Sequence, residues 1–218
     1  SLSEQGRSHW ESLKNWDKRY TSSSEDATFF ELWWKRLYHK IYDDEYATAP
    51  KPIFWPRETT CMESLLKDSM YVFVDDARTP EKESLRKIVS DAFTDAIDSA
   101  NKLQQIHKSE WSVFQNTSIA HLLKLPSFSH ANLIASGNVN ALNATSSDHG
   151  QSWRMIVQLG QETEAYGIYP GGQSGNPGSK FYDPFIDTWA KQDYYKLWMM
   201  KSSEQKDKRI KSIITFSS

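Results

Sequence analysis

Glycine is distributed unevenly along this chain, and its distribution constrains what each half can fold into. Gly6 is the only glycine among the first 136 residues, and the other eight lie from Gly137 onward. Glycine weakens helices and supplies the backbone freedom that tight turns need. The sequence therefore predicts an α+β fold, with a helical first half followed by antiparallel strands.

Apolar residues repeat at helical spacing in four parts of the first half. We expect helices over residues 4–20 and 25–44, and the TSSSED stretch offers N-cap candidates for the second. Thr60 and Glu63 form a capping-box pattern that predicts the start of a third helix. Thr79, as N-cap of a helix with Pro80 in its first turn, predicts the start of the longest one.

The second half shows strand patterns instead. Apolar and polar residues alternate over 153–159, which predicts a strand with one buried face. A partner strand is expected at 164–169 and a weaker one at 139–145. The glycine-rich segment 170–179 predicts a loop with tight turns, and a last short helix is expected at 185–191.

Length and patterning together suggest two segments. The 218 residues fit one ordinary domain or two small ones. We divide them into a mainly helical segment, 1–125, and a strand-rich segment, 126–218, that carries the glycine loop and the C-terminal helix.

Charge and hydropathy exclude two classes of partner. The chain has 26 Lys and Arg against 28 Asp and Glu, so the basic footprint of most nucleic-acid binders is missing and no nucleic acid is expected. The longest apolar run, Met70 to Val74, is far shorter than the roughly 20 residues of a spanning helix, so no membrane span is expected. No signal peptide is recognisable at the N-terminus, which indicates that one is absent or was removed.

No metal or nucleotide motif is present in the sequence. Its single cysteine, Cys61, excludes an internal disulfide, and the six histidines form no H-E-x-x-H pattern. Gly178-Ser179-Lys180 lacks the spacing of a phosphate-binding loop. The acidic pairs Asp43-Asp44 and Asp75-Asp76 lie at expected element ends, where we interpret them as caps or turn formers.

Aromatic residues make up 13% of the chain, and many lie in the stripe from Phe29 to Tyr42. Such a stripe could bind sugars or a membrane surface. Its polar face carries charges of both signs, which is typical of a solvated face, so we favour packing in the core. That face comprises Glu31, Lys35, Arg36, Lys40 and Asp44.

Ser1 is a candidate N-terminal nucleophile by position alone. Such a serine must be held rigidly, with its own amine as general base. The polar residues that follow, Leu2-Ser3-Glu4-Gln5-Gly6, lead into a helix rather than a buried strand. We therefore interpret Ser1 as the start of a truncated piece and assign it no catalytic role.

Several motifs, taken in order, resemble one enzyme family. The blocks HGQSWRMIVQL at 149–159 and AYGIYPGGQSGNPGS at 165–179 are similar to the C-terminal region of the penicillin amidase (penicillin acylase) family. Leu13 to Asp17, Glu110-Trp111, Ile119 to Leu122 and Asn140 to Ala144 resemble its upstream elements. The resemblance covers about residues 10–200 in one order.

The resemblance implies an N-terminal-nucleophile hydrolase of αββα architecture. Enzymes of this family cleave their own precursor, and the newly exposed serine of the large subunit attacks an amide. This chain resembles only the last part of the large subunit. The resemblance thus implies one fragment of a larger catalytic domain, inactive alone, whose partners are the remainder of its own precursor and a small-molecule amide substrate.

The same resemblance implies where the other functional parts lie. The family's oxyanion-hole asparagine and acidic calcium ligands precede this region, so no cofactor or metal is expected here, and the parent would be exported to the periplasm or the extracellular space. No catalytic residue is carried over. The family-motif residues, which we interpret as structural, are His149, Gly150, Ser152, Trp153, Arg154, Gly171, Gly172, Gln173, Ser174, Gly175, Asn176 and Gly178.

The implied strand at 149–159 belongs to the core of the catalytic sheet, with Trp153 and Met155 packed against helices. Arg154 is expected to pair with an acid or with carbonyls, because a buried unpaired guanidinium is costly. Two alternatives stay open for the function. One is an acyl-homoserine lactone acylase on the same scaffold, and the other is a non-catalytic interaction module or a family member without the nucleophile.

Overall fold

The computed structural model describes residues 2–46, 49–51, 53–201 and 207–216. Within it the chain forms two compact units. The first, helical unit comprises the residues up to Asn116 together with Ser136–Asn138, and the second, strand-containing unit comprises Thr117–Ala135 and the residues from Val139 onward. Ser1 lies outside the described residues. The expected boundary at residue 125 stays a prediction.

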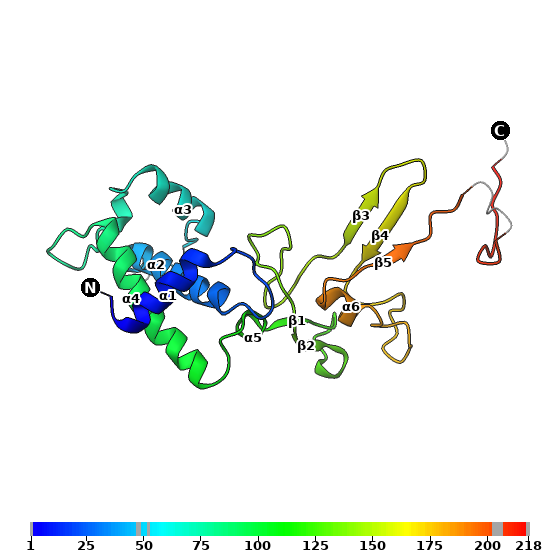
Figure 1. Ribbon diagram of the computed structural model, residues 1–218, viewed down its shortest axis with the longest axis horizontal. Helices are drawn as coiled ribbons and strands as arrows, with labels where there is room; N and C mark the ends of the chain where they lie inside the picture. Colours follow the sequence, from blue (N-terminus) through cyan, green and yellow to red (C-terminus); the bar gives the residue numbers. More distant parts are fainter. Residues whose placement is uncertain (1, 47–48, 52, 202–206, 217–218) are drawn as a thin grey trace. The chain divides into compact units, whose positions relative to one another are not determined.

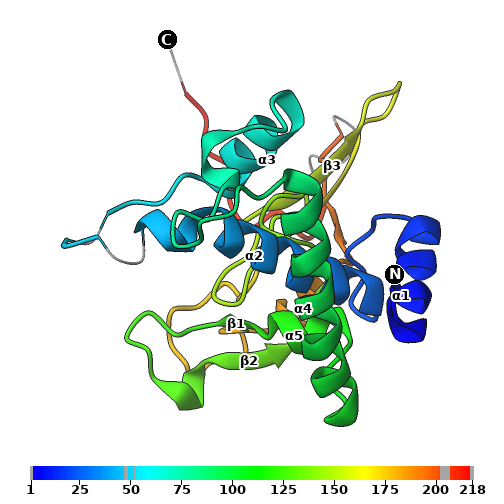
Figure 2. The same cartoon turned by 90° about the vertical axis from the view of Figure 1, so that its left-hand side faces the viewer.

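Helices build the first unit, as the scarcity of glycine predicts (Figure 1). The two long helices, α2 (Glu25–Tyr46) and α4 (Leu85–Gln105), pack side by side (Figure 2). The shorter elements of this unit are α1 (Glu4–Asn15), α3 (Glu58–Lys67), the 3-10 turn η1 (Val72–Val74) and α5 (Trp111–Gln115).

The aromatic stripe of α2 packs in the core, as expected. Trp34, Ile41 and Tyr42 are buried in one cluster with residues of α3, η1 and α4. Phe29 is buried in a second cluster, against Phe93 and other residues of α4. Burial of each large apolar side chain contributes about 1.5–3 kcal/mol, so the seam between α2 and α4 carries much of this unit's stability.

Two of the expected N-caps are wrong. Thr60 lies inside α3, which begins after Arg57 without a side-chain cap. Ser84, rather than Thr79, caps α4 and accepts a hydrogen bond from the Lys87 amide. Thr79 instead bonds to neighbouring groups of its own turn, including Glu83, so local side-chain bonding competes there with helix initiation. The prediction for α2 is right, because Ser24 Oγ accepts from the Ala27 amide at 3.1 Å.

The polar face of α2 is less solvated than expected. Glu31 is only 7% exposed, and its Oε1 accepts hydrogen bonds from Tyr20 at 2.7 Å and from Asn138 at 2.9 Å. Asp44 is equally buried and accepts from the amide of Ala77 at 2.7 Å. Buried carboxylates persist where donors satisfy them, and the sequence alone does not reveal donors that are distant along the chain.

Among the described residues, the regular part of the second unit consists of five short strands, one 3-10 turn and one short α-helix. In one sheet β4 (Glu164–Ile168) lies between β3 (Arg154–Gln158) and β5 (Tyr195–Leu197), and both pairings are antiparallel. Arg154 opposes Ile168 and Gln158 opposes Glu164. A separate pair joins β1 (Thr117–Ile119) to β2 (His130–Leu133). The remaining elements are η2 (Pro126–Phe128) and α6 (Ile186–Ala190).

Three expectations for this unit need correction. Residues 139–145 form turns and bends, not a strand, and Val139 and Leu142 are exposed. The expected buried face of 153–159 is absent, since β3 is an edge strand whose Met155 is 49% exposed. Trp153 packs on Tyr169 rather than on a helix. By contrast, the antiparallel partner strand, the glycine loop and the last helix lie where they are expected.

No helix among the described residues is long and apolar enough to cross a membrane.

Candidate functional site: the Arg154 and Trp189 cluster

The cluster around Trp189 brings together two of the family-motif residues, Gly150 and Arg154. Trp189, on α6, is 2% exposed, and its indole nitrogen donates to the carbonyl of Gln151 at 3.0 Å. A Cβ on Gly150 would lie 2.4 Å from Cζ2 of the same indole. Position 150 therefore needs glycine because the ring of Trp189 occupies the space that any side chain would need.

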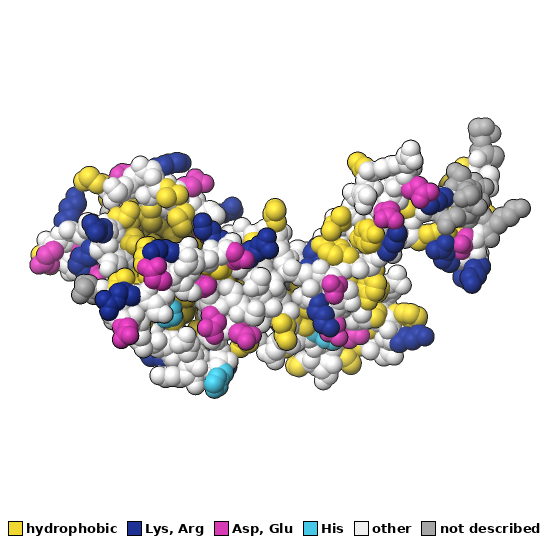
Figure 3. All heavy atoms as spheres, viewed as in Figure 1, with side chains coloured by type: hydrophobic (Ala, Val, Ile, Leu, Met, Phe, Trp, Pro, Cys, Tyr) yellow, Lys and Arg dark blue, Asp and Glu magenta, His cyan; other side chains and the backbone are white. Residues whose placement is uncertain are grey.

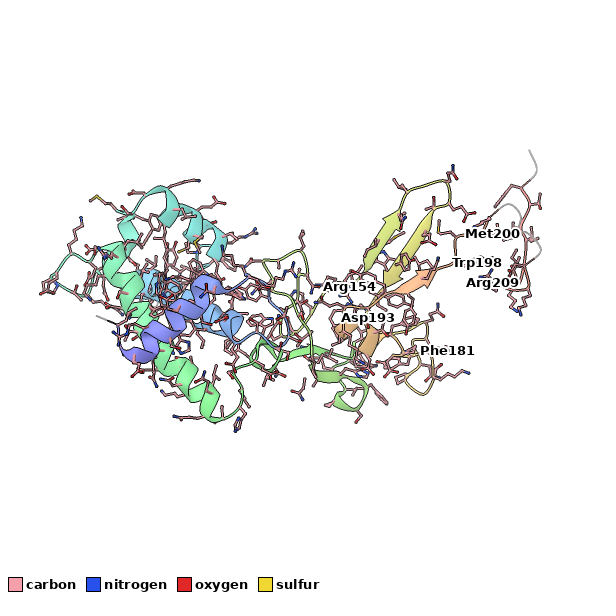
Figure 4. All side chains as sticks on the ribbon, viewed as in Figure 1. Arg154, Phe181, Asp193, Trp198, Met200 and Arg209 are labelled. Atoms are coloured by element: carbon pink, nitrogen blue, oxygen red, sulfur yellow. The ribbon has the colours of Figure 1, made fainter. Side chains whose placement is uncertain are left out.

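Arg154 lies at the start of β3 and binds the same helix. Its Nη2 donates to the carbonyl of Trp189 at 2.5 Å, which confirms the expected pairing with a carbonyl. The guanidinium also lies over the rings of Trp189, at 5.7 Å, and Tyr194, at 5.4 Å. Burial lowers the pKa of Arg154, whereas Tyr194 and Asp193 act in the opposite direction. Figure 4 labels Arg154 and Asp193 in this unit.

The glycine loop is held by hydrogen bonds within it and by contacts with the segment just before α6. The Gly171 carbonyl accepts from the amide of Phe185 at 2.9 Å, and Gly171 has a φ of 119° that favours glycine. Gly172 has no room for a Cβ, which would lie 2.2 Å from the Phe181 carbonyl oxygen. Ser174 and Asn176 cap turns within the loop. The arrangement fixes the backbone and gathers no catalytic groups.

The remaining motif residues do not meet in one place. His149, Ser152 and Gln173 are exposed, as are Gly175 and Gly178. Ser146, Asp148 and His149 are close together, but the serine oxygen and the aspartate oxygen both contact Nδ1 of the histidine, at 2.8 Å and 2.7 Å. A catalytic triad needs the acid and the nucleophile on opposite ring nitrogens, so this group does not form one.

The sequence did not reveal two structural features of this unit, the buried ring of Trp189 and the contact between His130 and Asp183. The sequence gives Trp189 no role beyond its place in an expected helix, because Gly150, the glycine beside its ring, is distant along the chain. His130 Nε2 contacts Asp183 Oδ2 at 2.8 Å and so links β2 to the segment before α6. No spacing rule could reveal that pair, because 53 residues separate its members.

Among the described residues, no group of three or more His, Cys, Asp or Glu side chains is arranged to hold a metal ion. The calcium ligands that the resemblance assigns to an upstream region stay a prediction.

A comparison with solved structures defines the fold. The chain matches a thermostable penicillin G acylase from Alcaligenes faecalis with a TM-score of 0.53 and 12% sequence identity, over the whole of this chain and 44% of the other. The helices followed by antiparallel strands are thus similar in fold to part of that acylase, which agrees with the α+β class that the sequence predicts.

Sequence comparisons then show the family. The model of the penicillin amidase family matches residues 2–206, and the chain belongs to that family. Its relatives include proteins named acyl-homoserine lactone acylase QuiP. The one from Pseudomonas syringae pv. syringae is 23% identical over 89% of this chain and 26% of its own length. The one from Pseudomonas aeruginosa is 26% identical over 86% of this chain and 26% of its own length.

These matches also show how much of the relatives the chain represents. It spans about a quarter of the length of the curated relatives that it matches.

Proposed function

We propose that this chain is the C-terminal part of an amide-hydrolysing acylase and that it supplies scaffold rather than the nucleophile. The observation that carries the proposal is the family match over 2–206 in a chain that spans about a quarter of its relatives. The described motif residues support it, since Gly150 and Arg154 pack around Trp189, Gly171 to Asn176 turn the chain, and His149 forms no triad. The exposed apolar side chains of β3 fit a strand that the rest of such an enzyme would cover.

In this proposal the parent enzyme transfers the acyl group of a linear amide to an N-terminal serine that lies outside this chain. Water then hydrolyses the acyl-enzyme, and the products are a carboxylic acid and an amine. The family resemblance also supports export of the parent, a precursor that cleaves itself, and calcium bound by upstream residues.

The relatives favour one substrate class within this proposal. The curated relatives described above are named acyl-homoserine lactone acylase, whereas the penicillin acylase is a structural neighbour at only 12% identity. We therefore propose N-acyl-homoserine lactones as the first substrates to test, with penicillin G as the alternative.

The test compares this chain with the product of the longest open reading frame that contains it. We expect the longer product to split into two subunits, the larger of which begins with serine, and to release homoserine lactone from its N-acyl derivative. The 218-residue chain alone should not turn over the substrate or a chromogenic acyl-anilide. Turnover by this chain that Ser1→Ala abolishes would contradict the proposal. A reading frame that starts directly before Leu2 would favour an interaction module instead.

A further inference from the structure

An aromatic groove on the helical unit has no role in the proposed chemistry. It has a volume of about 380 Å³ and lies between α1, the segment that follows it, and α2. Hydrophobic side chains gather on this unit in the space-filling view (Figure 3). The lining residues are Trp10, Leu13, Lys14, Trp16, Lys18, Tyr20, Phe30 and Trp33.

The aromatic side chains of the groove are held in place by contacts with one another and with the core. The ring of Trp16 lies 5.7 Å from Phe30, and Trp10 lies edge-on to Trp33 at 6.5 Å. The indole nitrogens of Trp16 and Trp33 donate to backbone carbonyls, at 3.2 Å and 3.1 Å. The groove thus presents a firm apolar surface whose volume falls within the usual range of small-molecule sites.

Charge on the groove is of one sign. Lys14 and Lys18 both line it and both are exposed, whereas no acid does. Lys14 contacts Glu11 at 2.9 Å, and among the described residues no carboxylate lies within ion-pair distance of Lys18. The apolar surface therefore lies beside ammonium groups that remain in water, which complements a ligand with an apolar body and an anionic end.

The backbone at Lys18 adds an independent observation. Its φ is 62°, in the left-handed region that residues other than glycine, asparagine and aspartate rarely adopt. The Asp17 side chain, which accepts from the Arg19 amide at 2.9 Å, helps to hold this turn. Strained conformations of this kind cluster at ligand sites.

We propose that this groove binds an amphiphilic carboxylate, with its acyl or aromatic body on the rings of Trp16, Phe30 and Trp33 and its carboxylate beside Lys18. The inference stands on the groove itself and does not require the proposed function. If that function is right, the acid released by amide hydrolysis belongs to the class that the groove would take.

The first experiment locates binding on the full chain. The tryptophan indole N–H signals of the ¹⁵N-labelled protein are followed by NMR during titration with octanoate. We expect the signals of Trp10, Trp16 and Trp33 to shift, and the signal of Trp189 to stay in place because that ring is buried in the other unit. Shifts confined to Trp153 or Trp198 would assign binding to the strand-containing unit and overturn the proposal.

The second experiment tests the charge. Octylamine and octanol have the same chain length without the anion, and both should bind more weakly than octanoate. Lys18→Gln should raise the octanoate Kd roughly two- to five-fold, as loss of an exposed ion pair predicts, and added salt should reduce the difference. Lys18→Arg keeps the positive charge and should bind octanoate as tightly as the wild type does. Lys102→Gln, on the exposed surface of α4, is the matched control and should leave the Kd unchanged.

Equal binding of the three ligands, or an unchanged Kd in Lys18→Gln, would overturn the proposal. Trp16→Ala provides a test of the apolar surface and should weaken octanoate binding if circular dichroism shows a folded protein. If that variant fails to fold, the lysine variants still test whether the groove binds octanoate. Concentration-dependent shifts of the Trp10, Trp16 and Trp33 indole signals without any ligand would show a second copy of the chain in the groove, and would also overturn the proposal.

Discussion

Individual glycines of the second unit differ in what they require, although the sequence presents them as one group. Gly150 and Gly172 have no room for a side chain, and Gly171 has a left-handed backbone. Gly175 has neither constraint, because no atom lies within 4 Å of the place where its Cβ would be. The family motif therefore combines positions that the packing requires with positions that it tolerates.

The glycine comparison can be tested by two single substitutions. Gly150→Ala should lower the free energy of unfolding by about 1–3 kcal/mol, because its Cβ would overlap the ring of Trp189. Gly175→Ala is the matched control, and should leave stability unchanged or raise it by up to about 1 kcal/mol. Urea unfolding followed by tryptophan fluorescence measures both. Equal effects would contradict the packing argument.

Arg154 joins β3 to α6 and to the segment that follows it, through a hydrogen bond to the Trp189 carbonyl and contacts with the rings of Trp189 and Tyr194. Arg154→Met keeps much of the apolar stem but leaves the Trp189 carbonyl without this donor. We expect a loss of about 1–2 kcal/mol in unfolding free energy, measured by urea denaturation. Arg86→Met, on the exposed surface of α4, makes the same chemical change and should have little effect. A comparable loss in the control would mean that the charge, rather than the contact, is responsible.

At the scale of an element, α2 combines strong apolar packing with an unfavourable end. Its last turn carries no basic residue, and Asp44 and Glu45 lie where the helix dipole disfavours negative charge. Burial, and then the neighbouring Asp44, raise the pKa of Glu45 to about 7. The C-terminal end of the central helix thus contains a carboxyl group that titrates near neutral pH.

This carboxyl group makes the stability of the helical unit depend on pH. Since the folded-state pKa of Glu45 lies above its value in an unfolded chain, about 4.3, its stabilising contribution is present below that value and is lost as pH rises through about 7. The melting temperature should therefore fall between about pH 5 and pH 8, and Glu45→Gln should flatten that slope. Glu81→Gln, at an exposed turn, should leave the slope unchanged. Thermal melts across this pH range measure both variants.

At the scale of the whole molecule, the apolar side chains of β3 form one surface that the described residues leave uncovered. Met155, Ile156 and Val157 are each at least 41% exposed, and β3 is paired on one side only. An apolar edge strand favours association with other chains. In the proposed parent enzyme, other parts of the protein would cover this surface.

The isolated chain should therefore associate in solution. Sedimentation velocity should show species larger than the monomer, and Val157→Lys should shift the distribution towards the monomer by placing a charge on the edge strand. Val113→Lys, on the helical unit at a similar exposure of 43%, is the control. A monomeric and highly stable wild-type chain would count against the proposal that it is part of a larger enzyme.

The sequence by itself determined the order of helices and strands along the chain and the family to which the chain belongs. Apolar periodicity located α2 and α4, alternation located β3 and β4, and the motif blocks at 149–159 and 165–179 pointed to the penicillin amidase family. These features are local or are linear strings of residues, so they can be read without knowledge of contacts.

Only the tertiary structure decided which groups meet. It showed that Trp189 occupies the space beside Gly150, that Tyr20 and Asn138 satisfy a buried Glu31, and that Ser84 caps α4 in place of Thr79. It also showed that β3 is an exposed edge strand. Each of these outcomes depends on competition among neighbours in space, and many of those neighbours are distant along the chain, whereas periodicity reports only which face of an element is apolar.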